Sequence, residues 1–336
     1  MTKNSHEYEY AYLARTAPLL AFDEAKPYEA WRESVREKLT DLLGLPLTAC
    51  APNLTVESRE ELSDRTEIYF TVETEPGYIV PCWLFWPVGK PSAPLTICLS
   101  GHGGGMHVAA GKAKTPEDEE ALKSWPHRAM ALRAIRDGRC ALVIEARSFG
   151  EASLKGYGTS CTEASKIAIL MGRTAIGERV WDAMRILDAV LAEFPEVERE
   201  GIACTGNSGG GTATYYLACI DERIAVAAPS CAVCTYEASI AAMMHCMCNH
   251  IPSIRKYFEM GDLACLIAPR RLIVAAGRDD KIFPLDGVKK TWDVIERIYR
   301  AAGAPDNCAL VVGEGGYLNW ADLIWAKNAE MEGESK

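Results

Sequence analysis

The chain has 336 residues, of which 49% are hydrophobic and 24% are charged, as in an ordinary globular enzyme with a sizeable core. Its formal net charge of -10 argues against a nucleic-acid groove and against an anionic membrane surface. The N-terminus lacks an apolar signal core, and no stretch approaches the ~20 apolar residues of a membrane span. The 13 cysteines are odd in number and scattered, as in reduced proteins. We therefore expect a cytoplasmic protein without a disulfide framework.

The N-terminal region predicts one helix followed by antiparallel strands. Apolar residues at helical spacing cover 27–43 and stop before Gly44 and Pro46. We treat residues 1–50 as a helical N-terminal extension packed on the main domain. Strand-like runs follow at 54–58, 66–73 and 78–86, the last two joined by a hairpin turn at Glu75-Pro-Gly77. This pattern is typical of the edge of a large mixed sheet.

From residue 94 onward, short apolar strands alternate with amphipathic helices such as 178–194 and 287–301. This alternation predicts an α/β fold with a mostly parallel, doubly wound sheet, here a single catalytic domain over residues 51–336. The irregular stretches 148–172 and 230–262 interrupt the pattern, and we expect them to form lid-like insertions or pocket walls at the carboxyl edge of the sheet. The predicted strands are 95–99, 140–144, 201–204, 224–228, 271–275 and 309–312.

A small-residue turn after the predicted strand 201–204 carries a candidate nucleophile. Gly206-Asn-Ser208-Gly-Gly210 fits G-x-S-x-G, the strand-to-helix elbow that presents a serine hydroxyl above a sheet. The sharp turn leaves no room for Cβ atoms beside the serine, which explains the flanking glycines. Five residues with two free positions are weak evidence alone, so the interpretation depends on supporting groups elsewhere.

Two further motifs supply such groups. Gly101-His-Gly-Gly-Gly105 follows a strand where hydrolases of this fold present a backbone N–H, so we predict an oxyanion hole made by Gly103, Gly104 and Gly209. We expect His102 to brace this loop through hydrogen bonds rather than to transfer protons. Gly277-Arg-Asp-Asp280 lies between a strand and a helix, in the order Ser then Asp. We favour Asp280 as the acid, with Asp279 as a turn-capping neighbour.

From about residue 60 onward, the chain resembles the acetyl-xylan-esterase-like and dienelactone-hydrolase-like branch of the α/β-hydrolases. The resemblance implies an α/β-hydrolase fold, Ser208 as nucleophile, Asp280 as acid, and a small or carbohydrate-like ester as substrate. It rests on the Ser208 and Asp280 motifs and on five further segments: Gly101-His-Gly-Gly-Gly105, Asp221-Glu-Arg-Ile224, Gly261-Asp-Leu263, Ile267-Ala-Pro-Arg270 and Glu314-Gly-Gly316.

The family pattern also requires a histidine directly after Glu314-Gly-Gly316, where this chain has Tyr317. A free phenol has a pKa of ~10, so only about one in a thousand is ionised at neutral pH and Tyr317 is a poor general base. Loss of the triad histidine costs on the order of 10⁶ in turnover, while oxyanion hole and binding retain roughly 10³–10⁴ over water. We therefore expect a serine hydrolase of the carboxylesterase type whose activity is impaired or altered.

Three interpretations of Tyr317 stay open. A histidine elsewhere, such as His245, His250, His107 or His127, reaches Ser208, since a triad is defined by geometry. Alternatively, Tyr317 acts as an acid or hydrogen-bond donor in a non-hydrolytic reaction such as a lyase step. In the third, the histidine has been lost or replaced and Tyr317 fills the space, leaving a feeble esterase or a ligand-binding pseudoenzyme.

Several polar residues border the expected cleft. We take His102, Glu145, Arg147 and His245 as substrate-pocket candidates, although ion-paired scaffolding is the commoner role for residues such as Glu145 and Arg147. The expected partner is a small-molecule ester, with no nucleic acid and no membrane, and a homo-oligomer is left open.

One stretch resembles a set of zinc ligands. It comprises Cys231, Cys234, His245, Cys246, Cys248 and His250. Because its surroundings suggest a buried helix, on which residues 246 and 248 would face different sides, we expect structural cysteines and no metal site. No dinucleotide or phosphate-loop motif is present, and we expect no cofactor.

Overall fold

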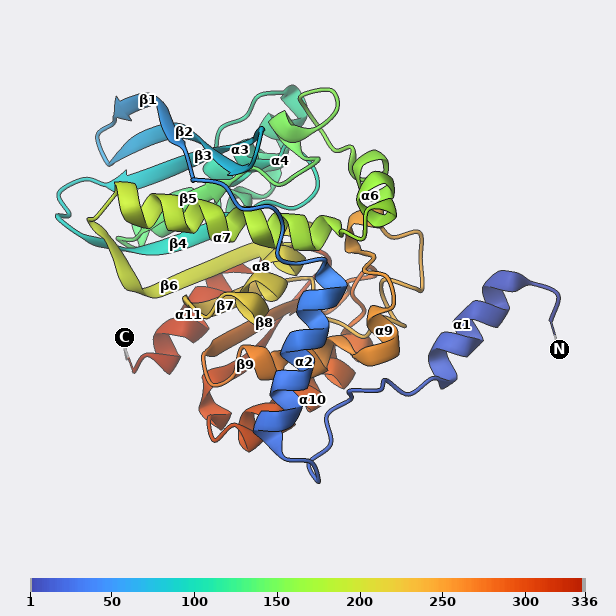
Figure 1. Cartoon of the computed structure of the whole chain (residues 1–336). Helices are drawn as coiled ribbons and strands as arrows, with labels where there is room; N and C mark the ends of the chain where they lie inside the picture. The colour runs from blue at the N-terminus through green and yellow to red at the C-terminus, as the bar shows by residue number, and fades with distance from the viewer. Residues whose placement is uncertain (1, 334–336) are drawn as a thin grey trace.

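In the computed structural model, which describes residues 2–333, the strands form one nine-stranded sheet of order β1-β2-β3-β5-β4-β6-β7-β8-β9 (Figure 1). The first three strands are antiparallel, and the hairpin between β2 and β3 turns where Glu75 pairs with Tyr78. The other six run parallel to one another. The strands are β1 Leu54–Glu61, β2 Arg65–Glu75, β3 Tyr78–Pro87, β4 Ala93–Leu99, β5 Cys140–Ile144, β6 Val197–Asn207, β7 Ile224–Ser230, β8 Arg271–Gly277 and β9 Cys308–Gly313.

Helices cover both faces of this sheet, as the alternating pattern predicts. The α-helices are α1 Ser5–Arg15, α2 Tyr28–Leu43, α3 Met106–Ala110, α4 Pro116–Ser124, α5 Met130–Arg136, α6 Cys161–Leu170, α7 Ala175–Glu193, α8 Gly209–Ile220, α9 Ile254–Tyr257, α10 Leu285–Ala301 and α11 Ala321–Met331. Short 3₁₀ turns are η1 Pro126–Arg128, η2 Gly150–Ala152, η3 Met247–Asn249, η4 Met260–Leu266 and η5 Pro305–Asn307.

Side chains of the central strands alternate between two cores because successive residues of a strand point to opposite faces. Leu95 and Ile97 on β4 belong to the larger core, which is covered by α2, α7, α8 and α10. Cys98 on the same strand faces a smaller core formed with α3 and α5. A third cluster packs Ile324 of α11 against β7 and β8. The predicted α/β-hydrolase fold is confirmed.

The N-terminal extension has two helices rather than one. α2 corresponds to the predicted helix and ends at Gly44, which adopts a left-handed φ of 74°. α1 was not predicted, because it has no buried residue and therefore no apolar stripe. It projects from the body of the molecule (Figure 1), held in part by the Tyr10 hydroxyl donating to the Glu237 carbonyl at 3.1 Å.

The two irregular stretches become loops with short helical turns. Residues 148–172 contain η2 and α6, and 230–262 contain η3, α9 and the start of η4. Cys161 of α6 and Cys248 of η3 pack into one small cluster with Phe149, so the two insertions contact each other. Within residues 2–333, no helix has the length and apolarity needed to cross a membrane.

A very close backbone approach lies where α8 begins. A Cβ atom at Gly210 would overlap the backbone carbonyl of Leu99, which cannot move without breaking the β4–β6 pairing. Gly210→Ala should therefore lower the free energy of unfolding by about 3 kcal/mol or more. Urea denaturation measures the change.

Gly77→Ala is the matched control for this substitution. Gly77 has a φ of 80°, but no atom lies near the position that a Cβ would occupy, so only backbone strain of about 1 kcal/mol is expected. Equal losses in the two variants would contradict the packing argument.

Candidate active site

Ser208 occupies a strained turn between β6 and α8. Its φ of 59° and ψ of -125° lie outside the regions that residues other than glycine normally adopt. The turn is held by the Ser208 N–H donating to the Ser230 carbonyl at 3.0 Å. A Cβ atom at Gly206 would overlap Gly210, so the two glycines of the motif permit this geometry. The side chain of Ser208 borders a cavity described below.

The glycine-rich loop after β4 lies directly against this turn. β4 and β6 are hydrogen-bonded neighbours, with Leu99 opposite Gly206, so the two loops leave the sheet side by side. Within residues 2–333, the backbone N–H groups of Gly103, Gly104 and Gly209 donate to no protein acceptor. Three unpaired donors beside a serine form an arrangement that can bind a developing negative charge.

Asp280 is buried at the end of β8, whereas its neighbour Asp279 is exposed. One carboxylate oxygen, Oδ1, accepts hydrogen bonds from the N–H groups of Ile282 at 2.7 Å and Phe283 at 3.0 Å. The other oxygen, Oδ2, is buried and has no hydrogen-bond partner among the described residues. A buried carboxylate oxygen without a donor is costly, and it marks a place where a hydrogen-bond donor is missing.

Tyr317 lies on the loop that packs over Asp280. The Asp279 N–H donates to the Gly315 carbonyl at 2.7 Å, which fixes this loop against the end of β8. The phenol ring stacks on Phe283, with the two rings 7° from parallel and their centres 6.3 Å apart. Burial, followed by the charges of Cys231 and Asp280, raises the pKa of Tyr317 above its usual value. The phenol is therefore neutral at physiological pH, and the ionised form that could accept a proton is rarer than in a free tyrosine.

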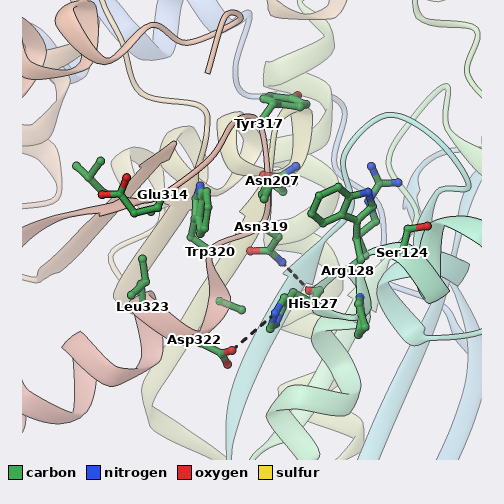
Figure 2. Close-up of a pocket in the computed structure, with 16 residues that line it drawn as sticks. Ser124, His127, Arg128, Asn207, Glu314, Tyr317, Asn319, Trp320, Asp322 and Leu323 are labelled. Atoms are coloured by element: carbon green, nitrogen blue, oxygen red, sulfur yellow. Dashed lines mark hydrogen bonds and ion pairs between the residues drawn. The ribbon is translucent and has the colours of Figure 1, made fainter. Parts of the chain in front are cut away.

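Ser208 and Tyr317 line the same small cavity of about 90 Å³, together with residues of the glycine-rich loop. A larger cavity of about 570 Å³ adjoins it and shares Arg128, Asn207, Tyr317 and Asn319 with it. Figure 2 shows the larger cavity between the segments 124–128 and 312–323, bridged by the Asn319 side chain, which donates to the His127 carbonyl at 2.8 Å. The insertions 148–172 and 230–262, which we expected as pocket walls or a lid, line neither cavity.

The four pocket candidates have different positions. His102 lines the small cavity, while Glu145, Arg147 and His245 line neither. Arg147 instead forms ion pairs with Asp182 at 2.6 Å and Glu75 at 2.7 Å, so its role is the scaffolding one. His245 Nδ1 accepts a hydrogen bond from the Asn249 side-chain amide at 3.1 Å.

Glu145 supports the glycine-rich loop from below. Its carboxylate accepts the N–H groups of Met106 at 3.0 Å and Glu151 at 3.1 Å. Gly105 packs against it closely enough that a Cβ atom there would lie 2.6 Å from the carboxylate. Glu145 is 1% exposed, and this burial raises its pKa to about 8.

The histidines considered as replacement bases each have another partner. His107 contacts Glu151 at 2.8 Å, and His127 lies 3.7 Å from Asp322. His250 contacts the Cys246 carbonyl at 3.2 Å, and His245 is engaged by Asn249. Within residues 2–333, none of the four hydrogen-bonds to Ser208 or Asp280.

Sequence reasoning missed much of the cavity lining. Segment 124–128 lies far from every recognised motif in the sequence, and its only signal is the aromatic and basic run Trp125-Pro-His-Arg128. Asn207 and Asn319 sit beside recognised residues but belong to no pattern. Asn207 is one of the two free positions of the elbow motif.

A model of the Abhydrolase family matches residues 7–313 of this chain. The chain belongs to that family. Among curated proteins it is 27% identical over 298 residues to the Bacillus subtilis (strain 168) protein named "Putative hydrolase YtaP", a match that covers 86% of this chain and 95% of that protein.

Solved structures of the same fold extend this likeness. A Bacteroides fragilis NCTC 9343 structure described as a "putative acetyl xylan esterase" superposes with a TM-score of 0.80 at 18% identity, covering 93% of this chain and 82% of that one. A glucuronoyl esterase from Solibacter usitatus superposes with a TM-score of 0.67 at 15% identity, covering 94% of this chain and 99% of that one. At these identities, the likeness establishes the shared fold.

Because the pKa of Glu145 is raised on folding, the free energy of unfolding should depend on pH. Because the unfolded carboxyl has a pKa of about 4.3, the folded state holds the proton more tightly. The stabilisation is full below about pH 4 and is lost as pH rises through about 8, the pKa in the folded protein. At pH 5, Glu145→Gln should have a lower free energy of unfolding than the wild type. By pH 8.5 this difference should be much smaller, because the wild type must then bury a charge and the glutamine variant does not.

Urea denaturation of both proteins across this pH range measures the difference. A gap between them that stays constant with pH would show that Glu145 does not take up a proton on folding.

Proposed function

We propose that the protein is a serine-type carboxylic ester hydrolase that acts through an acyl-enzyme on Ser208. The observation that carries the proposal is the strained turn at Ser208, which lines a small cavity together with Gly104 and lies beside backbone N–H groups that have no acceptor among residues 2–333. The neighbours of the same fold are named as esterases, which favours this reaction class. Asp280 would be the acid, and Gly103, Gly104 and Gly209 would supply the oxyanion hole.

The reaction proceeds by two acyl transfers. The Ser208 oxygen attacks the ester carbonyl carbon, the bond to the alcohol oxygen breaks, and the serine proton passes to the departing alcohol. Water then attacks the acyl-serine and releases the acid, returning a proton to Ser208. Both steps need a group that accepts and returns a proton at neutral pH, as imidazole does.

Tyr317 supplies this proton transfer poorly. Its phenol is held neutral by burial and by neighbouring charges, so it donates a hydrogen bond but does not remove the serine proton. The unpartnered oxygen of Asp280 supports the same view, because a triad histidine would donate to it. We infer an esterase with a presented nucleophile and a missing base.

A second candidate function follows from Tyr317 itself. A neutral phenol that lines both cavities is a hydrogen-bond donor, and it would suit a lyase step or ligand binding without hydrolysis. In this alternative, Ser208 positions a ligand and forms no covalent bond.

Restoring histidine at position 317 separates these functions. Tyr317→His should raise the hydrolysis of an aryl acetate at pH 7.5 by about 100-fold or more, since loss of a triad base costs on the order of 10⁶. The new imidazole would donate to Asp280 Oδ2. Turnover of the aryl acetate by the purified chain is the measurement.

Tyr317→Phe is the matched control, with the same ring and no donor. It should leave hydrolysis near the wild-type level, and Ser208→Ala should abolish the gain when combined with Tyr317→His. If Tyr317→Phe instead lowers hydrolysis as far as Ser208→Ala does, Tyr317 itself takes part in hydrolysis and the missing base is the wrong explanation. If neither Tyr317→His nor Ser208→Ala changes hydrolysis, the second candidate is favoured.

The substrate of this proposed esterase is a small or carbohydrate-like ester. The larger cavity combines the aromatic rings of Trp125 and Trp320 with amide groups of Asn207 and Asn319, a mixture that suits a polyhydroxylated ring. Arg128 lines both cavities, and its guanidinium forms no ion pair or hydrogen bond with residues 2–333. An unpaired guanidinium there would bind a carbonyl or carboxylate oxygen of the substrate.

Arg128→Ala tests this assignment in the Tyr317→His background. KM for an ester carrying a carboxylate should rise by about 10-fold or more, the value of one hydrogen bond to a charged group, with kcat nearly unchanged. KM for a neutral aryl acetate serves as the internal control. An equal change for both esters would assign Arg128 to the scaffold.

A further inference from the structure

Four potential metal ligands from three separate segments meet beside the glycine-rich loop. His102 comes from that loop, Cys161 is the first residue of α6, and Cys246 and Cys248 flank the start of η3. Their ligand atoms all lie within 4.8 Å of one another. Cys161 is 4% exposed and Cys248 1% exposed, while His102 and Cys246 are half-buried, so the cluster lies mostly within the protein.

The spacing of these atoms fits a single ion. A tetrahedral zinc site with Zn–S bonds of about 2.3 Å has ligand atoms about 3.5–3.8 Å apart. Here the Cys248 sulfur lies 3.3 Å from His102 Nε2 and 3.3 Å from the Cys246 sulfur. The Cys161 sulfur lies 3.7 Å from the same nitrogen. Three sulfurs and one imidazole nitrogen are donors that zinc prefers.

The positive charge of Arg179 next to the cluster independently supports a zinc site. Arg179 is 5% exposed, and its guanidinium lies 4.3 Å from the ring centre of Phe149. It donates to the Cys161 sulfur at 3.5 Å and to the Arg147 carbonyl, but to no carboxylate among residues 2–333. A buried guanidinium without an anion is strongly disfavoured.

Zinc binding would supply the missing negative charge because it keeps the three cysteine thiols ionised. One Zn²⁺ with three thiolates and a neutral imidazole carries a net charge of -1, which balances Arg179. Protonated thiols would leave the guanidinium uncompensated. Asn249 also points an amide N–H at the Cys248 sulfur, 3.8 Å away, as residues outside a metal's ligand set often do.

We infer that His102, Cys161, Cys246 and Cys248 bind one zinc ion, which ties both insertions to the glycine-rich loop. All four positions are filled by protein, so the ion is structural and activates no water. The position of the zinc ion next to the glycine-rich loop connects it with the proposed reaction. A Cβ atom at Gly209 would lie 3.0 Å from the His102 ring, so the ring packs against the residue after the nucleophile.

This consequence rests on the proposed esterase function, whereas zinc binding itself does not. With the ion in place, His102 would be fixed, and with it the adjacent Gly103 and Gly104. With the ion removed, the oxyanion loop and the two insertions would be free to separate.

The expectation of no metal site rested on a group of residues that shares only Cys246 and Cys248 with this cluster. Cys231 and Cys234 lie elsewhere, donating to the carbonyls of Leu318 and Pro284. Cys246 and Cys248 were expected on opposite sides of an α-helix, but Cys246 has an extended ψ of 135° and precedes a 3₁₀ turn. Their sulfurs therefore face the same point.

Metal analysis of the full chain tests the inference. The protein is purified without a metal-chelate column, under reducing conditions and with zinc in the growth medium. Mass spectrometry of the elements should find about one zinc per chain. Cys248→Ser and Cys161→Ser should lower this to below about a tenth, while Cys234→Ser, a buried cysteine outside the cluster, should retain it.

Cobalt titration keeps the test decisive if the cysteine variants fail to fold. Metal-free wild-type protein should bind one equivalent of Co²⁺ and develop the visible absorption of a tetrahedral cobalt–thiolate site, which one equivalent of Zn²⁺ then removes. A chain without zinc and without this absorption overturns the inference. So does a zinc-free chain whose intact mass shows a Cys246–Cys248 disulfide under the same conditions.

A separate readout distinguishes the metal site from the esterase function. Ser208→Ala should retain zinc and lose labelling by a fluorophosphonate. Zinc without labelling of the wild type would contradict only the proposed function, and labelling without zinc would contradict only the metal site. If both hold, removal of zinc by a chelator should slow the labelling of Ser208.

Discussion

The approach of α8 to the end of β4 is the constraint on which the site depends. Gly210 packs on the Leu99 carbonyl so closely that no side chain fits between them. Since β4 and β6 are adjacent in the sheet, this contact sets the glycine-rich loop and the Ser208 turn side by side. The buried carboxylate of Glu145 then supports the loop from below, through the Met106 N–H. Ser208 and the unpaired N–H groups are thus positioned by backbone packing.

The loop that carries Tyr317 and the Asp280 carboxylate are also held in place by hydrogen bonds. The loop carrying Tyr317 is fixed by the hydrogen bond from Asp279 to Gly315, and Asp280 beneath it has one satisfied and one unsatisfied carboxylate oxygen. Under the proposed function, a histidine at this position would donate to the unsatisfied oxygen of Asp280. A phenol with a raised pKa stacks on Phe283 instead. Under the proposed function, the scaffold of an esterase is kept and its proton carrier is absent.

The sequence predicted what local patterns encode and missed what distant segments create. Continuous apolar runs located the central strands, and the glycines near Ser208 predicted a turn that only small residues permit. By contrast, α1 buries no residue, so periodicity gave no signal for it. The cavity wall at 124–128 faces the site only through tertiary packing. The cysteine cluster was missed because His102 and Cys161 lie far from Cys248 in sequence, and because η3 is not an α-helix.

The pH dependence of covalent labelling of Ser208 tests the central claim most directly. The rate of fluorophosphonate attachment, followed by intact mass, reports how readily the serine loses its proton. For the wild type we predict a slow rate that rises steadily with pH, without an inflection near the imidazole pKa of about 6.5. Tyr317→His should be faster and show that inflection. Ser208→Ala, which should not be labelled at all, confirms that the rate reports on Ser208. A wild-type profile with an inflection near neutral pH would mean that another histidine serves as the base and would contradict the account.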